Sequence, residues 1–275
     1  MRWIPVTMTN NKVTNSDSIK GLEYEETRLL DGRVACLQPV NGYRTAIDPV
    51  LLAASIDAKA GERVLDVGSG TGAASLCLAS RVRGVEITGI EIQPEYAGLA
   101  RKSAELSGVA DQINFVTADL SELPKDEKFR EFDHVMTNPP YVESGRGRVP
   151  PDTLKARATV ESHVDLGSWI AHCLKMTRSR GTFTIIHRAD RLEHIMPPIN
   201  GVLGHIVVFP LWPSRINKDK QGGVNANRVI ISGRKGIKSP GVLSSGIAMH
   251  EKDSGVYTDE VRSILSDRAS LKLYN

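Results

Sequence analysis

A short apolar segment that runs straight into a glycine-rich turn constrains the fold of this chain more than any other feature. Arg63-Val64-Leu65-Asp66-Val67 is followed by Gly68-Ser69-Gly70-Thr71-Gly72, and residues 73–81 then carry apolar side chains at helical spacing. Residues 85–90 form a second, β-branched run that closes on Glu91. The pattern predicts a strand, a tight turn, a helix and a second strand, which together make one βαβ unit with parallel strands.

The same alternation of strands and helices continues along the chain. A helix is expected over 94–107, because Pro94 suits its first turn and Gly108 suits its end. Periodicity predicts further strands over 113–116, 132–136, 181–186, 206–209 and 228–232, and further helices over 166–177 and 187–196. The chain is therefore predicted to be an α/β protein with a doubly wound, mostly parallel sheet of about seven strands and helices on both faces.

The chain of 275 residues is long enough for one such domain with appendages. We expect residues 1–60 to form an N-terminal leader, a hairpin arm at 34–37 and a helix at 48–55 that Asp48 caps. Residues 61–240 are expected to form the main domain, and residues 241–275 a C-terminal tail. No internal repeat or low-complexity tract divides the chain further.

The composition excludes several classes of protein. With 40% hydrophobic and 24% charged residues, the chain is neither disordered nor fibrous. The polar first twenty or so residues lack the apolar core of a signal peptide, and prolines interrupt the longest uncharged stretch of the second half, residues 196–214. Three cysteines without paired spacing favour a reducing compartment, and the seven histidines share no ligand spacing. We therefore expect a cytoplasmic protein with no membrane segment and no metal.

Positive charge is concentrated between Ser214 and Lys238. This segment holds seven Lys and Arg residues against one Asp, whereas the formal net charge of the whole chain is only +3. A basic segment rich in glycine and asparagine fits a solvated loop, and it equally fits a surface that contacts phosphate groups. Both interpretations stay open at this point.

The spacing of the glycines indicates the kind of ligand. Three glycines in the pattern Gly-x-Gly-x-Gly let a small molecule lie against bare backbone at a helix N-terminus, but the dinucleotide fingerprint places its last glycine one residue later. Asp66, two residues before Gly68, is suited to an ammonium group. Glu91, at the end of the next strand, suits the two hydroxyls of a ribose, and Asp119, at the end of the third, suits the amino group of an adenine. These acids predict a nucleoside that carries an amino acid.

A second motif, Asn138-Pro139-Pro140-Tyr141, directly follows the strand predicted over 132–136. The two prolines stiffen the backbone. The side-chain oxygen of Asn138 and the carbonyl of Pro139 are then able to accept hydrogen bonds from one planar NH₂ group, and Tyr141 offers a ring on which a flat substrate can stack. The motif predicts a substrate with an exocyclic or amide nitrogen, and Asn138, Pro139 and Tyr141 are its predicted catalytic residues.

Together these motifs make residues 61–186 resemble class I S-adenosylmethionine-dependent methyltransferases with a Rossmann-like fold, in particular the group that methylates adenine N6 or glutamine side chains. Residues 32–54, 187–190, 210–213 and 233–236 extend the resemblance to the bacterial tRNA1(Val) adenine N6-methyltransferase family. The resemblance implies the cofactor S-adenosylmethionine, the product S-adenosylhomocysteine and, as substrate, the adenosine 3′ of the anticodon. It also implies the following cofactor contacts: Arg44, Asp48, Asp66, Gly68, Ser69, Gly70, Gly72, Glu91, Ile92, Asp119, Leu120 and Asn138.

Transfer to an adenine N6 requires orientation more than a strong general base, because the lone pair is delocalised into the ring and the methyl sulfonium is already a strong electrophile. The tRNA is expected to contact basic residues on two segments, the second of which is the cluster between Ser214 and Lys238: Arg146, Arg148, Lys155, Arg157, Arg215, Lys218, Lys220, Arg228, Arg234, Lys235 and Lys238. Three alternatives stay open, namely methylation of a glutamine in a translation factor, methylation of adenine in another nucleic acid, and a cofactor-binding subunit that activates a partner. The sequence does not specify the oligomeric state.

Overall fold

The computed structural model describes residues 22–41, 47–123, 131–140, 165–214, 225–251 and 255–274. A nine-stranded sheet forms the centre of the protein, with the strand order β10-β8-β9-β7-β6-β3-β4-β5 and with β11 paired to β8. Its strands are β3 (Arg63–Val67), β4 (Glu86–Glu91), β5 (Ile113–Thr117), β6 (Phe132–Thr137), β7 (Thr177–Arg188), β8 (Leu203–Ser214), β9 (Arg228–Lys235), β10 (Val242–Leu243) and β11 (Ile247–His250).

Strands β3 to β7 are parallel to one another, and β9 is antiparallel to both of its neighbours, β7 and β8. This arrangement confirms the predicted fold class. The seven expected strands are all present, and β10 and β11 are two short additions from the segment that was expected to be a tail. The carboxyl ends of β3, β4, β5 and β6 lie at one edge, where ligands bind in such sheets.

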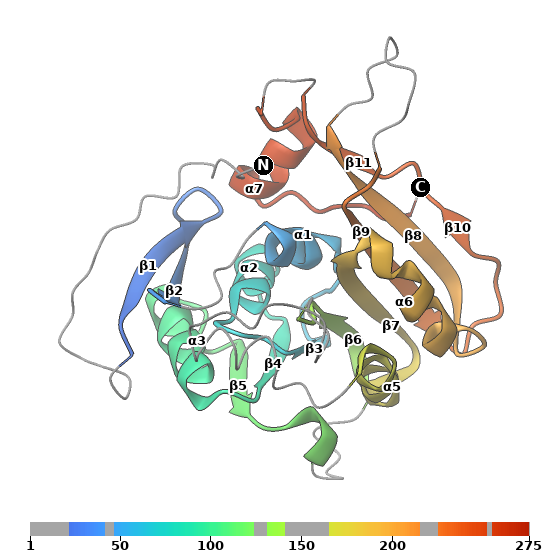
Figure 1. Ribbon diagram of the computed structural model, residues 1–275. Coiled ribbons are helices and arrows are strands. Elements are labelled where there is room, and N and C mark those ends of the chain that lie inside the picture. Colours follow the sequence, from blue (N-terminus) through green and yellow to red (C-terminus); the bar gives the residue numbers. More distant parts are fainter. Residues whose placement is uncertain are drawn as a thin grey trace.

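Helices cover both faces of the sheet (Figure 1). One apolar cluster joins the sheet to helices α1 (Asp48–Ser55), α2 (Ala73–Arg81), α3 (Pro94–Leu106) and α7 (Asp259–Asp267), and a second joins the opposite face to α5 (Leu166–Met176) and α6 (Leu192–Ile199). Strands alternate between the clusters as their period of two requires, so that Val64 joins the first cluster and Leu65 the second. The sheet, with the carboxyl ends of β3 to β6 at one of its edges, therefore lies between two packed layers of helices.

The N-terminal hairpin consists of β1 (Tyr24–Leu29) and β2 (Val34–Pro39), which form a separate two-stranded sheet beside α3 (Figure 1). Hydroxyls of α3 and of the residue after it hold the hairpin in place, because Ser103 Oγ accepts from Leu37 N at 2.9 Å and Ser107 Oγ accepts from Ala35 N at 3.0 Å. The structure thus has a hairpin over residues 24–39, longer than the arm expected at 34–37, and it packs on α3.

Two local predictions were wrong. Asp48 does not cap α1, because the N-cap residue is Ile47 and Asp48 is the first residue of the helix. The helix expected over 187–196 starts only at Leu192, after a 3₁₀ turn over Ala189–Arg191. The reason is tertiary, since His187 and Arg188 continue β7 by pairing with Val229 and Arg228 of β9.

Every helix in the described part of the chain is too short or too polar to traverse a lipid bilayer.

Candidate functional site

The glycine-rich turn joins β3 to α2 and is tied to the neighbouring strand. The amides of Gly68 and Ser69 both donate to the carbonyl of Ile90, at 2.9 Å each. Gly72 has a φ of +87°, and a β-carbon there would lie 2.7 Å from the ring of Phe115. At Gly70, by contrast, a β-carbon would meet nothing within 4 Å. The turn is thus packed beneath and open at Gly70, where a ligand is able to approach the backbone.

Glu91 lies directly beside this turn. Its Oε2 accepts from Gly70 N at 2.8 Å, and its Oε1 accepts from Gln93 N at 2.9 Å. Burial raises the pKa of this carboxyl, while the backbone hydrogen bonds oppose the rise. Because each carboxylate oxygen has a second lone pair, Glu91 is suited to accept ligand hydroxyls while it holds the turn.

Asp66 is buried beneath the turn, and its Oδ2 accepts from Ser75 Oγ of α2 at 2.7 Å. Burial raises the pKa of this carboxyl to about 6, and the charge of Glu91 adds to the rise. A positive group placed nearby would stabilise the charged form of this buried carboxylate. Within the turn itself, Ser69 has a buried Oγ with no hydrogen-bond partner among the described residues.

Asp119 follows β5 and forms the N-cap of a 3₁₀ turn over Leu120–Glu122. Its Oδ1 accepts from both the amide and the hydroxyl of Ser121, at 2.7 Å each. Leu120 is buried, whereas Ile92 is 43% exposed. The three predicted acids thus stand on the adjacent strands β3, β4 and β5 or directly after them, as the sequence led us to expect.

Asn138 follows β6, which pairs with β3 through Thr137 and Val67. The asparagine therefore lies next to the start of the glycine-rich turn. Its side chain is half-buried, Pro139 is buried and Pro140 is exposed. The predicted amine-binding motif and the predicted cofactor turn are thus brought together at the centre of the sheet.

Thr137 and Trp169, which the sequence did not assign to the site, connect the glycine-rich turn to the segment that carries Asn138. Thr137 Oγ1 donates to Val67 O at 2.8 Å, and Trp169 Nε1 donates to Thr137 Oγ1 at 3.0 Å. The Trp169 ring also lies 2.9 Å from where a β-carbon on Gly68 would stand. The apolar spacing around Trp169 predicts only a core residue of its helix, and it holds no signal for this contact with another element.

Asp48 is buried, and its Oδ2 accepts from Arg228 Nε at 2.9 Å. The ion pair joins the N-terminal helix α1 to the start of β9. Arg228 pairs in register with Arg188, the last residue of β7. Helix α1 is thereby fixed to the strands on the other side of Asn138.

The structure does not bring Arg234 and Lys235 to the site. Arg234 pairs with Thr182 in the amino-terminal half of β7, toward the opposite edge of the sheet. Lys235 Nζ donates to the carbonyls of Leu174 and Thr177 at 2.7 Å each, which ties the end of α5. Other predicted contacts lie outside the described residues: Arg44, Tyr141, Arg146, Arg148, Lys155, Arg157, Arg215, Lys218 and Lys220.

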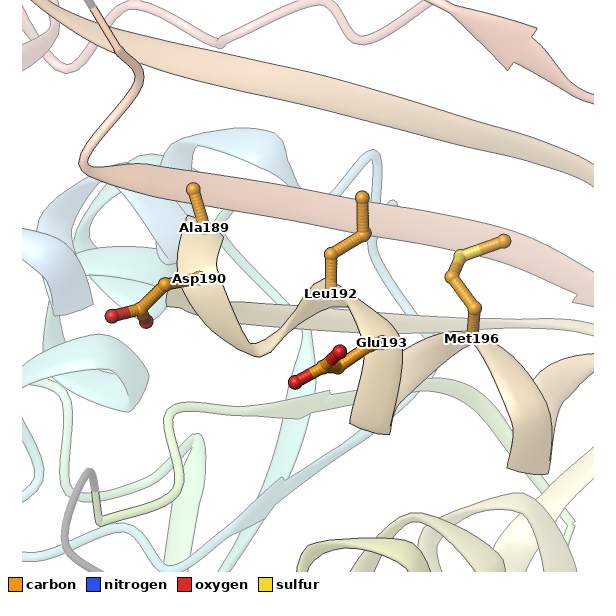
Figure 2. A pocket seen from close by; sticks show the side chains of 5 residues that line it. All are labelled: Ala189, Asp190, Leu192, Glu193 and Met196. Atoms are coloured by element: carbon orange, nitrogen blue, oxygen red, sulfur yellow. The ribbon is translucent and has the colours of Figure 1, made fainter.

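A hollow lies beyond the carboxyl end of β7, along the 3₁₀ turn and α6. Figure 2 shows Ala189, Leu192 and Met196 pointing to one side of this segment, and the carboxylates of Asp190 and Glu193 to the other. The described residues contain no group of three or more His, Cys, Asp or Glu side chains placed to hold a metal ion.

Comparisons with known proteins agree with this architecture. Residues 64–145 match a family described as "Methyltransferase domain". A solved structure from Agrobacterium tumefaciens, titled a predicted O-methyltransferase, superposes with a TM-score of 0.65 at 24% identity, covering 82% of this chain and 98% of that one. This likeness shows the fold.

Two curated relatives are similar to the central part of the chain. The tRNA1(Val) (adenine(37)-N6)-methyltransferase of Pasteurella multocida is 32% identical over 133 residues, which is 48% of this chain and 56% of that protein. The release factor glutamine methyltransferase of Chlorobaculum tepidum is 36% identical over 93 residues, 34% of this chain and 32% of that protein. The chain thus spans about half the length of the first relative and less of the second.

Proposed function

We propose that this chain, which belongs to the class I S-adenosylmethionine-dependent methyltransferases, methylates N6 of an adenosine in tRNA in the cytoplasm. The observation that carries the proposal is the position of Asn138 and Pro139, directly after β6 and beside the glycine-rich turn that follows β3. Similarity to the Pasteurella multocida enzyme supports an adenosine 3′ of the anticodon as the target.

The residues around the turn fit the cofactor. Gly70 leaves open space above the backbone, Ser69 has a buried hydroxyl in need of a partner, and Glu91 presents a carboxylate beside both. In the proposed complex Glu91 accepts from the ribose, Asp119 stands on the adenine side, and Asp66 favours the ammonium group electrostatically. When bound, S-adenosylmethionine supplies the electrophilic methyl group.

Asn138 and Pro139 are proposed to orient the substrate amine. The side-chain oxygen of Asn138 and the carbonyl oxygen of Pro139 each accept a hydrogen bond from one N–H group of the amine. The nitrogen lone pair then turns out of conjugation and toward the methyl group. Orientation of this kind contributes up to ~7–11 kcal/mol to lowering a barrier. Trp169, through its hydrogen bond to Thr137 and its contact with Gly68, holds the two halves of the site in register.

Methylation of a glutamine side chain is the second candidate. A carboxamide presents the same planar NH₂ group to Asn138 and Pro139, and the Chlorobaculum tepidum relative is a release factor glutamine methyltransferase. The tRNA proposal is preferred because arginines gather beside the motif, at the carboxyl end of β7 and the start of β9. A phosphate-bearing substrate makes use of them, and a neutral glutamine loop does not.

The test is transfer of labelled methyl groups from S-adenosylmethionine to bulk tRNA, total DNA and a translation-factor extract, followed by nucleoside analysis. We expect N6-methyladenosine in tRNA. Asn138→Ala is expected to lower the rate at least about 100-fold, the effect of losing alignment. Asn114→Ala, which changes an exposed asparagine on β5, is the matched control and is expected to retain full activity.

Label in protein alone, with methylglutamine as the product, would replace the proposal by the second candidate. Label in DNA alone would assign the chain to another nucleic-acid adenine methyltransferase. Transfer by Asn138→Ala at the wild-type rate would show that the amine is oriented by other residues.

A further inference from the structure

We infer that Arg188, Arg191 and Arg228 form a phosphate-binding group that holds the RNA strand next to the target adenosine. The inference rests on the proposed function and adds to it which described residues bind the nucleic acid. It concerns the carboxyl end of β7, the 3₁₀ turn after β7 and the start of β9, and Arg228 is the one residue that it takes from the basic segment 214–238.

The strand register places these arginines at the same edge of the sheet as Asn138. Thr137, the residue before Asn138, pairs with Ile185 of β7, so Arg188 lies three residues further in the direction in which Asn138 leaves the sheet. Arg228 lies opposite Arg188 on β9. Arg191 ends the 3₁₀ turn that begins directly after Arg188. All three are thus on the side of Asn138 that faces away from the glycine-rich turn.

The three guanidinium groups act on one residue. His187 lies on β7 opposite Val229 of β9 and is buried, and burial together with the positive charges of Arg191, Arg228 and Arg188 lowers its pKa to about 4. Each arginine therefore contributes positive charge to the same small region. The side chains of Arg188 and Arg228 are 46% and 26% exposed, which leaves both in contact with solvent at the edge.

Carboxylates hold two of these arginines in place. Arg188 Nε donates to Asp190 Oδ1 at 2.9 Å, and a second contact joins Arg188 Nη2 to the same carboxylate. Arg228 is fixed by the buried Asp48. An arginine that a carboxylate already orients loses less side-chain entropy when it binds a phosphate.

The charged residues at this edge follow the order of the strands, and the ion pairs of Asp190 and Asp48 lie on the arginine side. Acidic Asp119, Glu91 and Asp66 belong to the ends of β5, β4 and β3, Asn138 follows β6, and the arginines stand at β7 and β9. The acidic part suits the hydroxyls and ammonium group of the cofactor. The basic part suits the phosphates of a polyanion, and the amine acceptor lies between the two.

Basic residues at the other edge bind groups of that edge, far from Asn138. Arg178 Nε donates to Asp133 Oδ1 at 2.6 Å, and Arg234 donates to the carbonyl of Arg180 at 3.3 Å. Along β9, six residue steps separate Arg228 from Arg234, which is about 20 Å. Arg234 is therefore a control of the same residue type, which lies on the same strand as Arg228 but at the end of β9 far from Asn138.

The test is tRNA binding by the full chain, measured by filter binding over a series of salt concentrations. The logarithm of the association constant falls linearly with the logarithm of the salt concentration. Each lost phosphate contact is expected to make this negative slope shallower by about 0.7–1. We expect this for Arg188→Gln and for Arg191→Gln, and about twice the change for the double variant, with a higher KM for tRNA and little change in kcat. Arg234→Gln is expected to keep the wild-type slope, and thermal unfolding checks that every variant is folded.

A double variant that is folded and keeps the wild-type slope would overturn the inference, as would an equal loss in Arg234→Gln. The proposed function has a separate readout in the wild type. If the wild type methylates tRNA and the slopes do not move, only the arginine inference fails, whereas absence of transfer to any RNA removes both.

Discussion

Replacing Asp66 by asparagine is expected to stabilise the folded chain at neutral pH while weakening the binding of S-adenosylmethionine. The introduced carboxamide has almost the same shape as the carboxyl group, and its oxygen is still able to accept from Ser75 Oγ, which lies 2.7 Å from the aspartate. The substitution therefore removes the buried charge and keeps the hydrogen bond from Ser75 Oγ.

The size of the effect follows from the pKa. Raising the pKa of a carboxyl from 3.8 to about 6 corresponds to roughly 3 kcal/mol. The folded protein keeps the proton on Asp66 up to about pH 6, whereas the unfolded chain releases it near 3.8. The unfolding free energy of the wild type therefore falls as pH rises through this window, and Asp66→Asn does not share this fall. Roughly 2.5 kcal/mol of the difference develops between about pH 4 and pH 8.

The assay is thermal or urea unfolding of both proteins at several pH values. The advantage of the variant is expected to grow with pH until, at about pH 8, its Tm has gained about 5 °C relative to the wild type. All other titrating groups are common to both proteins and largely cancel. S-adenosylmethionine binding, measured by calorimetry, is expected to be weaker in the variant, because the buried charge no longer favours the ammonium group.

A difference in stability that does not change with pH would refute the reasoning, since the aspartate would then carry no buried charge in the folded state. Unchanged affinity for S-adenosylmethionine would refute the assignment of Asp66 to the cofactor and leave the stability argument intact.

Three further outcomes are expected. Gly72→Ala should lower the unfolding free energy by about 1–3 kcal/mol in urea titrations, because φ is +87° and Phe115 leaves no room, and a neutral result would contradict the strain argument. Trp169→Phe should cost about 1 kcal/mol by the same measurement, for the hydrogen bond to Thr137, and an equally stable variant would show that this bond contributes nothing. His187, with a pKa of about 4, should show no titration above about pH 5 in NMR spectra. Because the unfolded chain takes up this proton near pH 6.5, the contribution of neutral His187 to stability is lost as pH falls from 6.5 toward about 4. A titration midpoint near 6.5 would place His187 outside the influence of the three arginines.

The sequence was sufficient for the centre of the fold. Residues 63–67 and 73–81 form β3 and α2 with the predicted bounds, because a buried strand, a glycine turn and a helical period are all local signals. The position of Asn138 beside the turn was also predictable, since parallel strands align their carboxyl ends. The local pattern and the tertiary structure agree in this region.

Where a residue depends on a partner far along the chain, the local pattern predicted the wrong element or the wrong neighbours. The spacing after Ile186 favours a helix, but pairing with β9 extends β7 through Arg188. Lys235 belongs to a basic run that suggested phosphate binding, and the structure uses it to bind carbonyls at the end of α5. Arg228 and Arg234, which are near one another in sequence, lie toward two different edges, because the whole length of β9 separates them.

The position of β9 between β7 and β8 also affects how the protein emerges during synthesis. In the described sheet, β8 pairs with β9, β10 and β11, all of which follow it in the chain. The nascent β8 therefore leaves the ribosome before its partners, and the edge of β7 stays open until β9 arrives. Strands β3 to β6, which carry the glycine turn and lead to Asn138, are complete well before that. An open strand edge is prone to mispairing, so a pause in translation between β8 and β9 would leave β7 and β8 open to aggregation.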